Sequence, residues 1–252
     1  MSRNEDWVVR PARFVEYLRT VEGLSASEVR VPPRGVLVFA RDDFRVLCRR
    51  FGARVLKWNP RFAIGRVGKA PVLAFRTSIG APAAVLNLEE AIALGVRRVI
   101  SFGSCGSLVR DLRIGSLVLP TRAYSEEGTS RHYGGGRWAR PDVGLTDALR
   151  DACARRGVPV REGGTWTTDA PYREGRAKAR SLARRGIVSV EMEASALFRV
   201  ARVRGVRVAS LFVVSDELDG PEWNAGFADP RHAASMRTAA DAVLDAIGRS
   251  TG

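Results

Sequence analysis

Two acidic runs in this chain have the residue types needed to hold a sugar and to move a proton. The run Glu191-Met192-Glu193 follows the apolar stretch 187–190 and begins an amphipathic helix pattern. Two carboxylates beside a thioether at the mouth of a site can hold a vicinal diol, with the methionine lying on the sugar face. A carboxylate in the first turn of a helix also complements the helix dipole, which is the commoner explanation of such a run taken alone.

The second acidic run is Ser215-Asp216, which follows the fully apolar stretch 209–214. An aspartate at the end of a strand is often only a helix cap or a loop residue. A partly buried aspartate with a raised pKa can instead donate a proton to a leaving group.

A third run, Gly103-Ser104-Cys105-Gly106, follows the expected strand 96–102. Glycines let the backbone approach an anion closely, and the Ser104 hydroxyl adds a donor. Ligands of open α/β sheets bind outside the carboxyl ends of strands. The run matches neither a dinucleotide fingerprint nor a Walker loop. Anion binding and a plain tight turn are both open for this run alone.

Alternating strand and helix patterns must position these three runs. Such alternation predicts an α/β fold, a single three-layer domain over residues 1–252, with a central mixed β-sheet flanked by helices. Asp42 or Asp43 is expected to cap the helix at 44–51, and residues 126–140 are expected to form a mobile loop near a site. The expected strands are 35–40, 70–75, 96–102, 117–119, 165–167 and 206–214, and the expected helices are 44–51, 84–94, 146–156, 191–204 and 229–247.

Composition narrows the class of protein. The formal net charge is +14, but the arginines are spread along the chain without a basic block, which argues against nucleic-acid binding and leaves a surface that attracts small anions. No apolar stretch reaches the roughly 20 residues of a membrane span, and the N-terminus lacks a signal-peptide core, so we expect a cytoplasmic protein without membrane contact. Three widely spaced cysteines indicate reduced thiols. His132 and His232 lack metal-ligand spacing, so no metal is expected.

Taken together, the runs resemble the nucleoside phosphorylase family, which includes the hexameric purine nucleoside phosphorylases, the uridine phosphorylases and the methylthioadenosine nucleosidases. The resemblance extends from about Gly35 to Asp216. Its most specific element is Glu-Met-Glu followed some two dozen residues later by Ser-Asp. It also includes the Gly-Ser-Cys-Gly run and the run Glu127-Gly128-Thr129-Ser130.

The resemblance implies a role for each acidic run. Glu193 would bind the ribose 2′ and 3′ hydroxyls, with Met192 packed on the sugar and Glu191 beside them. Asp216 would protonate the purine N7 as the glycosidic bond breaks, and Arg231 is the nearest candidate to assist it. The only co-substrate implied is inorganic phosphate, without a further cofactor.

The phosphate site departs from the family pattern. Arg45, Gly103 and Ser104 match phosphate-binding positions. The family's Gly-Asp-Pro-x-Arg, however, reads Arg41-Asp42-Asp43-Phe44-Arg45 in this chain. Ser101 stands where the phosphorylases place an arginine, and the nucleosidases, which use water, lack that arginine. Phosphorolysis is the leading hypothesis, and hydrolysis is the alternative.

The base-lining region of the family corresponds to residues 165–174. Tyr172 is expected to stack on the base, Arg173 to hydrogen-bond to it, and Val190 and Asp216 to line it. The chain contains no glutamine, the residue with which uridine phosphorylases read uracil, so a purine is favoured; Arg173 keeps uracil open.

The leading hypothesis is therefore a purine nucleoside phosphorylase that forms a homo-oligomer, at least a dimer and possibly a hexamer, because the family shares its sites between subunits. The alternatives are a uridine phosphorylase or nucleosidase, and a nucleoside-binding protein without turnover.

Overall fold

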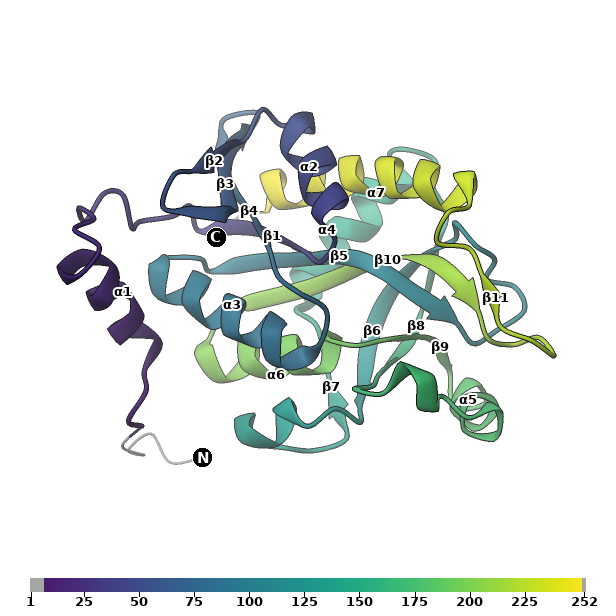
Figure 1. Cartoon of the computed structure of the whole chain (residues 1–252). Helices are drawn as coiled ribbons and strands as arrows, with labels where there is room; N and C mark the ends of the chain where they lie inside the picture. Colours follow the sequence, from purple (N-terminus) through teal and green to yellow (C-terminus); the bar gives the residue numbers. More distant parts are fainter. Residues whose placement is uncertain (1–6, 251–252) are drawn as a thin grey trace.

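The computed structural model describes residues 7–250 of the chain. Within this range lie seven α-helices, two short 3-10 helices and a sheet of eleven strands (Figure 1). The helices are α1 (Pro11–Thr20), α2 (Arg41–Arg50), α3 (Ala81–Leu94), α4 (Val143–Ala154), α5 (Arg176–Ala183), α6 (Ala194–Arg204) and α7 (Pro230–Arg249), with η1 (Thr129–Tyr133) and η2 (Pro171–Arg173). The strands are β1 (Arg34–Val38), β2 (Arg54–Leu56), β3 (Asn59–Val67), β4 (Ala70–Arg76), β5 (Arg98–Ser107), β6 (Leu117–Ser125), β7 (Trp138–Ala139), β8 (Val160–Thr167), β9 (Ile187–Glu191), β10 (Arg207–Glu217) and β11 (Asn224–Ala225).

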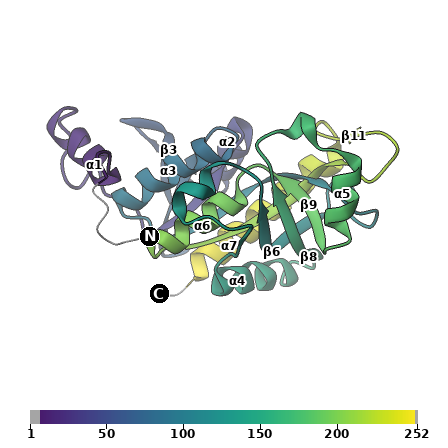
Figure 2. The same cartoon turned by 90° about the horizontal axis from the view of Figure 1, so that it is seen from below.

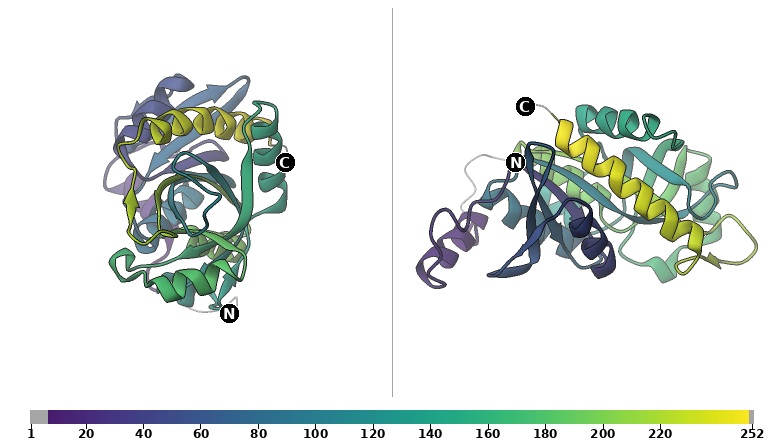
Figure 3. Two further views of the ribbon diagram at one scale, coloured as in Figure 1. Left: turned by 90° about the vertical axis from the view of Figure 1, so that its right-hand side faces the viewer. Right: turned by 90° about the horizontal axis from the view of Figure 1, so that it is seen from above.

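The sheet is mixed, as the sequence predicts, and part of it closes on itself. Its order is β11-β10-β6-β8-β9-β5-β1-β4-β3-β2, and β10 also pairs with β5. This extra pairing joins β10, β6, β8, β9 and β5 into a ring, so these strands have no free edge. The left view of Figure 3 looks toward this ring, with α7 above it. Both parallel pairs, such as β1–β5, and antiparallel pairs, such as β5–β9, occur.

Helices cover both faces of the sheet and give it three layers. Buried side chains of α2, α4 and α7 form one core with Val36, Val38 and Ile100. The opposite faces of the same strands, including Leu37 and Val99, pack with α3 and α6 in a second core. Figure 1 shows α2 and α7 above the sheet and α3 and α6 below it, and Figure 2 shows the second group from below. The central sheet between helical layers confirms the predicted α/β architecture.

Two local predictions are wrong. The run Gly103–Gly106 is not a turn, because β5 continues through it to Ser107 and pairs with β10 along its whole length. Ring closure supplies this strand with partners that its own sequence does not reveal. Helix α2 begins at Arg41, three residues before the expected start, and its N-cap is Ala40, without a side-chain cap. Asp42 and Asp43 lie in its first turn, where carboxylates complement the helix dipole.

Candidate active site

Strand register brings the three predicted runs to one region at the carboxyl-terminal end of β5. Val38, the last residue of β1, lies opposite Phe102, and Val190 of β9 lies opposite Gly106. On the other side of β5, Asp216 of β10 is also the partner of Gly106. The Ser104 region, the Glu191–Glu193 run and Asp216 are therefore neighbours in space, although 112 residues separate Ser104 from Asp216.

Close approach explains both glycines of β5. A Cβ on Gly103 would stand 2.8 Å from the ring of Phe39, the residue that follows β1. A Cβ on Gly106 would stand 2.6 Å from Leu218 and 3.1 Å from Oδ2 of Asp216. The glycines thus make room for an aromatic ring and for the Asp216 carboxylate, and Gly103 lies within a strand rather than in an anion-binding turn. Ser104, between them, is exposed.

A β-bulge directs Asp216 into the site. The register between β10 and β5 shifts between Val214 and Asp216, so Ser215 is the extra residue of the bulged strand. Bulges of this kind re-aim a side chain beside functional sites. The Ser215 hydroxyl donates to Oδ1 of Asp216 at 2.7 Å, and the indole N–H of Trp223 donates to Oδ2 at 2.8 Å. Trp223 is more than half exposed, on the segment between β10 and β11.

Glu191 is turned into the protein. Its Oε2 accepts hydrogen bonds from the backbone N–H groups of Glu193 (2.7 Å) and Ala194 (2.6 Å), and its Oε1 accepts from the Thr167 hydroxyl at 2.6 Å. Buried and with both oxygens engaged, it satisfies amides where α6 begins. Glu191 thus holds the acidic run in place, and this arrangement does not present it to a sugar.

Glu193 is held by the segment between β4 and α3. Its Oε1 accepts from the backbone N–H of Gly80, at the start of α3, at 2.6 Å. Burial and the neighbouring Glu191 carboxylate raise the pKa of Glu193. Met192 beside it is half-buried. The contacts of Glu193 with a diol and of Met192 with a sugar face stay predictions.

A chain of buried hydrogen bonds, which the sequence does not reveal, ties residues 126–140 to this run. Glu127 accepts from the hydroxyls of Ser125 and Ser195, both at 2.8 Å, and from the backbone N–H of Ser130 at 2.9 Å. Although burial raises its pKa, these donors lower the pKa of Glu127 overall. The Thr167 hydroxyl accepts from the Ser195 N–H at 3.0 Å and donates to Glu191. The expected loop contains η1 and β7 and is anchored by Glu127.

The predicted phosphate residues are only partly assembled. Ser101 is fully buried, and its hydroxyl lies 2.5 Å from that of Ser210, so the position of the family's arginine is sealed by a serine pair. Arg45 is exposed on α2 and forms an ion pair with Asp42 at 3.2 Å. Burial, together with the Asp42 charge, raises the pKa of Asp43 to about 6. Ser104 is the predicted phosphate residue that clearly faces the site.

Of the predicted base-binding residues, some lie at the site and others are exposed on the surface. Val190 is buried and would contact a Cβ placed on Gly106 at 3.0 Å, so it lines the site. Tyr172 is 96% exposed and Arg173 is also exposed, on η2, so neither is held against the other site residues. Glu174, not predicted, lies close enough to Asp216 that burial and the Asp216 charge raise its pKa to about 7.

Within residues 7–250, neither Arg231 nor His132 forms a hydrogen bond or ion pair with the carboxylate of Asp216. The Arg231 guanidinium forms hydrogen bonds to both oxygens of Asp229, the nearest at 2.7 Å, so it contacts the N-cap of α7 and is not brought to Asp216 as predicted. His132 is exposed on η1. His232, which no sequence pattern singles out, lies 3.0 Å from Ser104.

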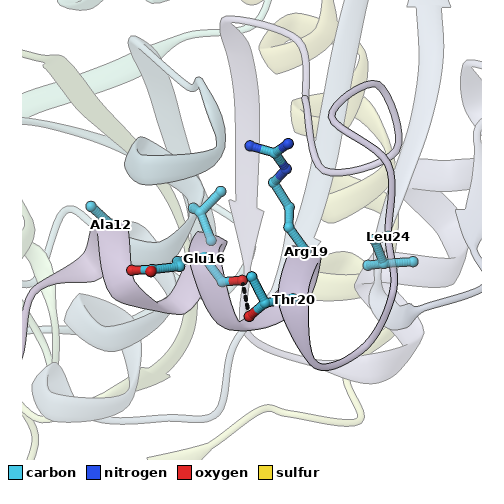
Figure 4. A pocket seen from close by; sticks show the side chains of 6 residues that line it. Ala12, Glu16, Arg19, Thr20 and Leu24 are labelled. Atoms are coloured by element: carbon cyan, nitrogen blue, oxygen red, sulfur yellow. Dashed lines mark hydrogen bonds between the residues drawn. The ribbon is translucent and has the colours of Figure 1, made fainter.

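Other features of residues 7–250 lie outside this region. A pocket of about 410 Å³ is formed by α1 and the turn that follows it (Figure 4), and it contains none of the predicted site residues. It is lined by Ala12, Val15, Glu16, Arg19, Thr20 and Leu24. All three cysteines are buried free thiols, as predicted. In this part of the chain, no helix combines the length and apolarity required to cross a bilayer, and no three His, Cys, Asp or Glu side chains are grouped to hold a metal.

Two solved structures with the same architecture are nucleoside phosphorylases. A purine nucleoside phosphorylase of Toxoplasma gondii, in complex with immucillin-H, superposes with a TM-score of 0.80 at 18% identity over 98% of both chains. A uridine phosphorylase of Vibrio fischeri superposes with a TM-score of 0.78 at 22% identity, over 88% of this chain and 95% of the other. These likenesses establish the fold.

The family follows from sequence comparison. The model of the phosphorylase superfamily matches residues 33–247, and the chain belongs to this superfamily. A guanosine phosphorylase of Halorubrum lacusprofundi is 32% identical over 143 residues, which cover 56% of this chain and 59% of that protein. A DeoD-type purine nucleoside phosphorylase of Myxococcus xanthus is 34% identical over 143 residues, 56% of this chain and 60% of that protein. The matches thus span about three-fifths of the length of these relatives.

Proposed function

We propose that the chain is a pentosyltransferase, a nucleoside phosphorylase that cleaves the N-glycosidic bond of a purine nucleoside with inorganic phosphate. The products are the free base and ribose 1-phosphate. The chain would act as one catalytic domain and would need no cofactor, with phosphate as its co-substrate. The names of its relatives, which include a guanosine phosphorylase and purine nucleoside phosphorylases, support this proposal.

One observation carries the proposal: an acid, a diol ligand and a hydroxyl donor meet at the same strand ends. Asp216 and Gly106 are register partners, Val190 lies on the other side of Gly106, and Ser104 is two residues away. Glu193 is fixed by Gly80 at the edge of this region. A nucleoside placed there would have its base toward Asp216 and its sugar toward Glu193 and Met192.

This arrangement suits departure of a purine. As the bond between C1′ and the base nitrogen breaks, positive charge develops on the sugar ring and negative charge on the base. A proton donated by Asp216 to N7 neutralises the base, and such general acid catalysis contributes about 10²–10⁴-fold. A phosphate anion near Ser104 would stabilise the ring cation and then form the new bond to C1′. Hydrogen phosphate loses its proton to solvent as the ester forms, and Asp216 takes up a proton from solvent in return, so the cycle has no net proton change.

Hydrolysis is the second candidate, and the sealed Ser101–Ser210 pair is the observation that favours it. Without the arginine, the site has less fixed positive charge with which to hold phosphate. Water would then attack C1′, and the sugar product would be ribose. A uracil substrate is favoured less, since the role proposed for Asp216 requires a purine nitrogen and Arg173 is exposed.

The wider setting is also a proposal. We expect a homo-oligomer, at least a dimer, acting in the cytoplasm in nucleoside salvage. The exposed apolar side chains of Ile79, just before α3, and of Leu86, within α3, support a covered surface in an assembly.

The test is base release from inosine, guanosine, adenosine and uridine, each with and without phosphate. We expect release from 6-oxopurine or adenine nucleosides that depends on phosphate. Release at the same rate without phosphate would establish the nucleosidase instead, and release from uridine alone would overturn the purine assignment. No release from any of the four would point to a nucleoside-binding protein.

A further inference from the structure

A serine–histidine contact joins two distant parts of the chain at the exposed face of β5. His232 lies in the first turn of α7, shortly after the N-cap Asp229 and Pro230. Its Nε2 atom is 3.0 Å from the hydroxyl oxygen of Ser104, which is 128 residues away in sequence. The imidazole is half-buried, whereas Ser104 is exposed. Two groups that can both donate hydrogen bonds thus point to the same place.

The surroundings of His232 shift its pKa in both directions, and the net shift is downward. Burial lowers the pKa of His232, and the carboxylates of Asp229 and Asp216 raise it in part. Asp229 belongs to the N-cap of the same helix, and Asp216 belongs to β10. Arg231, the neighbouring cation, is neutralised by Asp229. An anion brought to Ser104 would add a further negative charge and would favour the imidazolium.

The other expected sources of positive charge are engaged elsewhere. Ser101 takes the place of an arginine and is closed off by Ser210. Arg45 is exposed and lies against Asp42. Of the predicted phosphate residues, Ser104 is the one that faces the site, and His232 is in direct hydrogen-bond contact with it.

We propose that His232 is a phosphate-binding residue of this enzyme, holding the attacking anion together with Ser104. The proposal rests on the phosphorolysis proposed above. In the bound state Nε2–H and the Ser104 hydroxyl each donate to a phosphate oxygen instead of to each other. A charge-assisted hydrogen bond from an imidazolium is stronger than one from neutral imidazole. His232 therefore supplies, in protonated form, the positive charge that the sealed Ser101 position lacks.

The pH dependence follows from this linkage. Below the pKa of the free His232 the imidazolium is already present and phosphate binds tightly. Above that pKa, binding requires uptake of a proton, so the affinity for phosphate falls as pH rises. The KM for phosphate, calculated for each protonation state of phosphate itself, should thus rise with pH.

The chain has only two histidines, which makes a direct measurement possible. In protein labelled with 13C at histidine Cε1, the two ring signals are assigned with His232→Gln and His132→Gln. Inorganic phosphate is then added across a range of pH. We expect phosphate to shift the His232 signal and raise its midpoint, leaving exposed His132 unchanged. Equal response of both rings, or no response of His232, would overturn the proposal.

Kinetics separate phosphate binding from a purely structural role. His232→Ala should raise the KM for phosphate about tenfold or more at pH 6.5, while the KM for nucleoside stays within about twofold. His232→Gln keeps an N–H donor but cannot titrate, so it should partly restore affinity and abolish the pH dependence. His132→Ala is the matched control. An unchanged KM for phosphate in His232→Ala, or a parallel rise in both KM values, would overturn the proposal.

The two proposals fail separately. A phosphate-dependent shift of His232 in a protein that releases no base would refute phosphorolysis and leave the phosphate site standing. If base release depends on phosphate but phosphate does not shift the His232 ring signal, the role of His232 alone is refuted.

Discussion

Replacing Asp216 with asparagine removes the proton donor and the negative charge of this side chain but keeps its shape. Asparagine has the same shape, and its amide can satisfy the existing partners after one rotation. The carbonyl oxygen then accepts from the Trp223 indole, and the amide nitrogen faces the Ser215 hydroxyl, which can also accept. The fold and the sugar contacts at Glu193 should therefore persist, while the acidic proton is lost.

The expected size of the effect is that of general acid catalysis. For a purine nucleoside, kcat/KM should fall about 10²–10⁴-fold, which is roughly 3–5 kcal/mol of transition-state stabilisation. A nucleoside methylated at N7, such as 7-methylguanosine, already has the positive charge that protonation would create. On this substrate, Asp216→Asn should lose less than about tenfold, because departure of the base no longer needs the proton.

The assay compares inosine and 7-methylguanosine for the wild type, Asp216→Asn and Asp219→Asn. Asp219 lies three residues further on and pairs with Arg110 at 3.8 Å, so its variant removes the same charge without touching Gly106 or Trp223. The reasoning is refuted if Asp216→Asn loses activity equally on both substrates, or retains wild-type activity on inosine.

Two further variants test the supports of the site. Gly106→Ala should reduce kcat and lower stability by about 1–3 kcal/mol, since its Cβ would meet Leu218 and the Asp216 carboxylate. Gly175→Ala, with open space around it at the N-cap of α5, should leave kcat unchanged and lower stability by less than about 1 kcal/mol; equal thermal melts and activities for both would contradict the packing described. Glu127→Gln should be about 1–3 kcal/mol less stable than wild type at pH 7. Because hydrogen bonds lower the pKa of Glu127 in the folded state, its contribution is present above the ordinary value of 4.5 and lost as pH falls through the lowered value. The difference in melting temperature should thus shrink as the pH falls below the ordinary value of 4.5 and through the lowered value, and a difference independent of pH would count against the network.

Much of the fold can be predicted from the local pattern of apolar and polar residues in the sequence. Apolar runs such as residues 209–214 and the helical spacing before Gly95 correctly indicate β10 and α3, and their alternation indicates the layers. The ring closure of β10 on β5 cannot be found this way, because it depends on pairing between strands about a hundred residues apart. That pairing turns an apparent Gly-Ser-Cys-Gly turn into continuous strand.

The acidic runs indicate where the site lies, but they do not indicate which groups each carboxylate contacts. Spacing alone does not distinguish Glu191, which caps the start of α6, from Glu193, which is held by Gly80. The bulge at Ser215 leaves no local signal either, since it arises from register between two strands.

The remaining differences between the predicted and the observed site concern residues after β10. Arg231 follows Asp229 by two residues and pairs with it locally, which a search for a partner of Asp216 overlooks. His232 and Trp223 enter the site from segments after β10, and a lone histidine or an exposed tryptophan has no sequence pattern that marks it. The one sequence feature that could have drawn attention to His232 is its position as a basic residue in the first turn of the last helix.

The origin of the oxygen on C1′ of the sugar product tests the central claim most directly. Guanosine or inosine is converted by the wild-type chain in water enriched in 18O with unlabelled phosphate, and the sugar is analysed by mass spectrometry as it forms. We expect ribose 1-phosphate without 18O at C1′, in equal amount to the base released. Free ribose carrying 18O at C1′ as the first product would show that water is the nucleophile and would contradict the account.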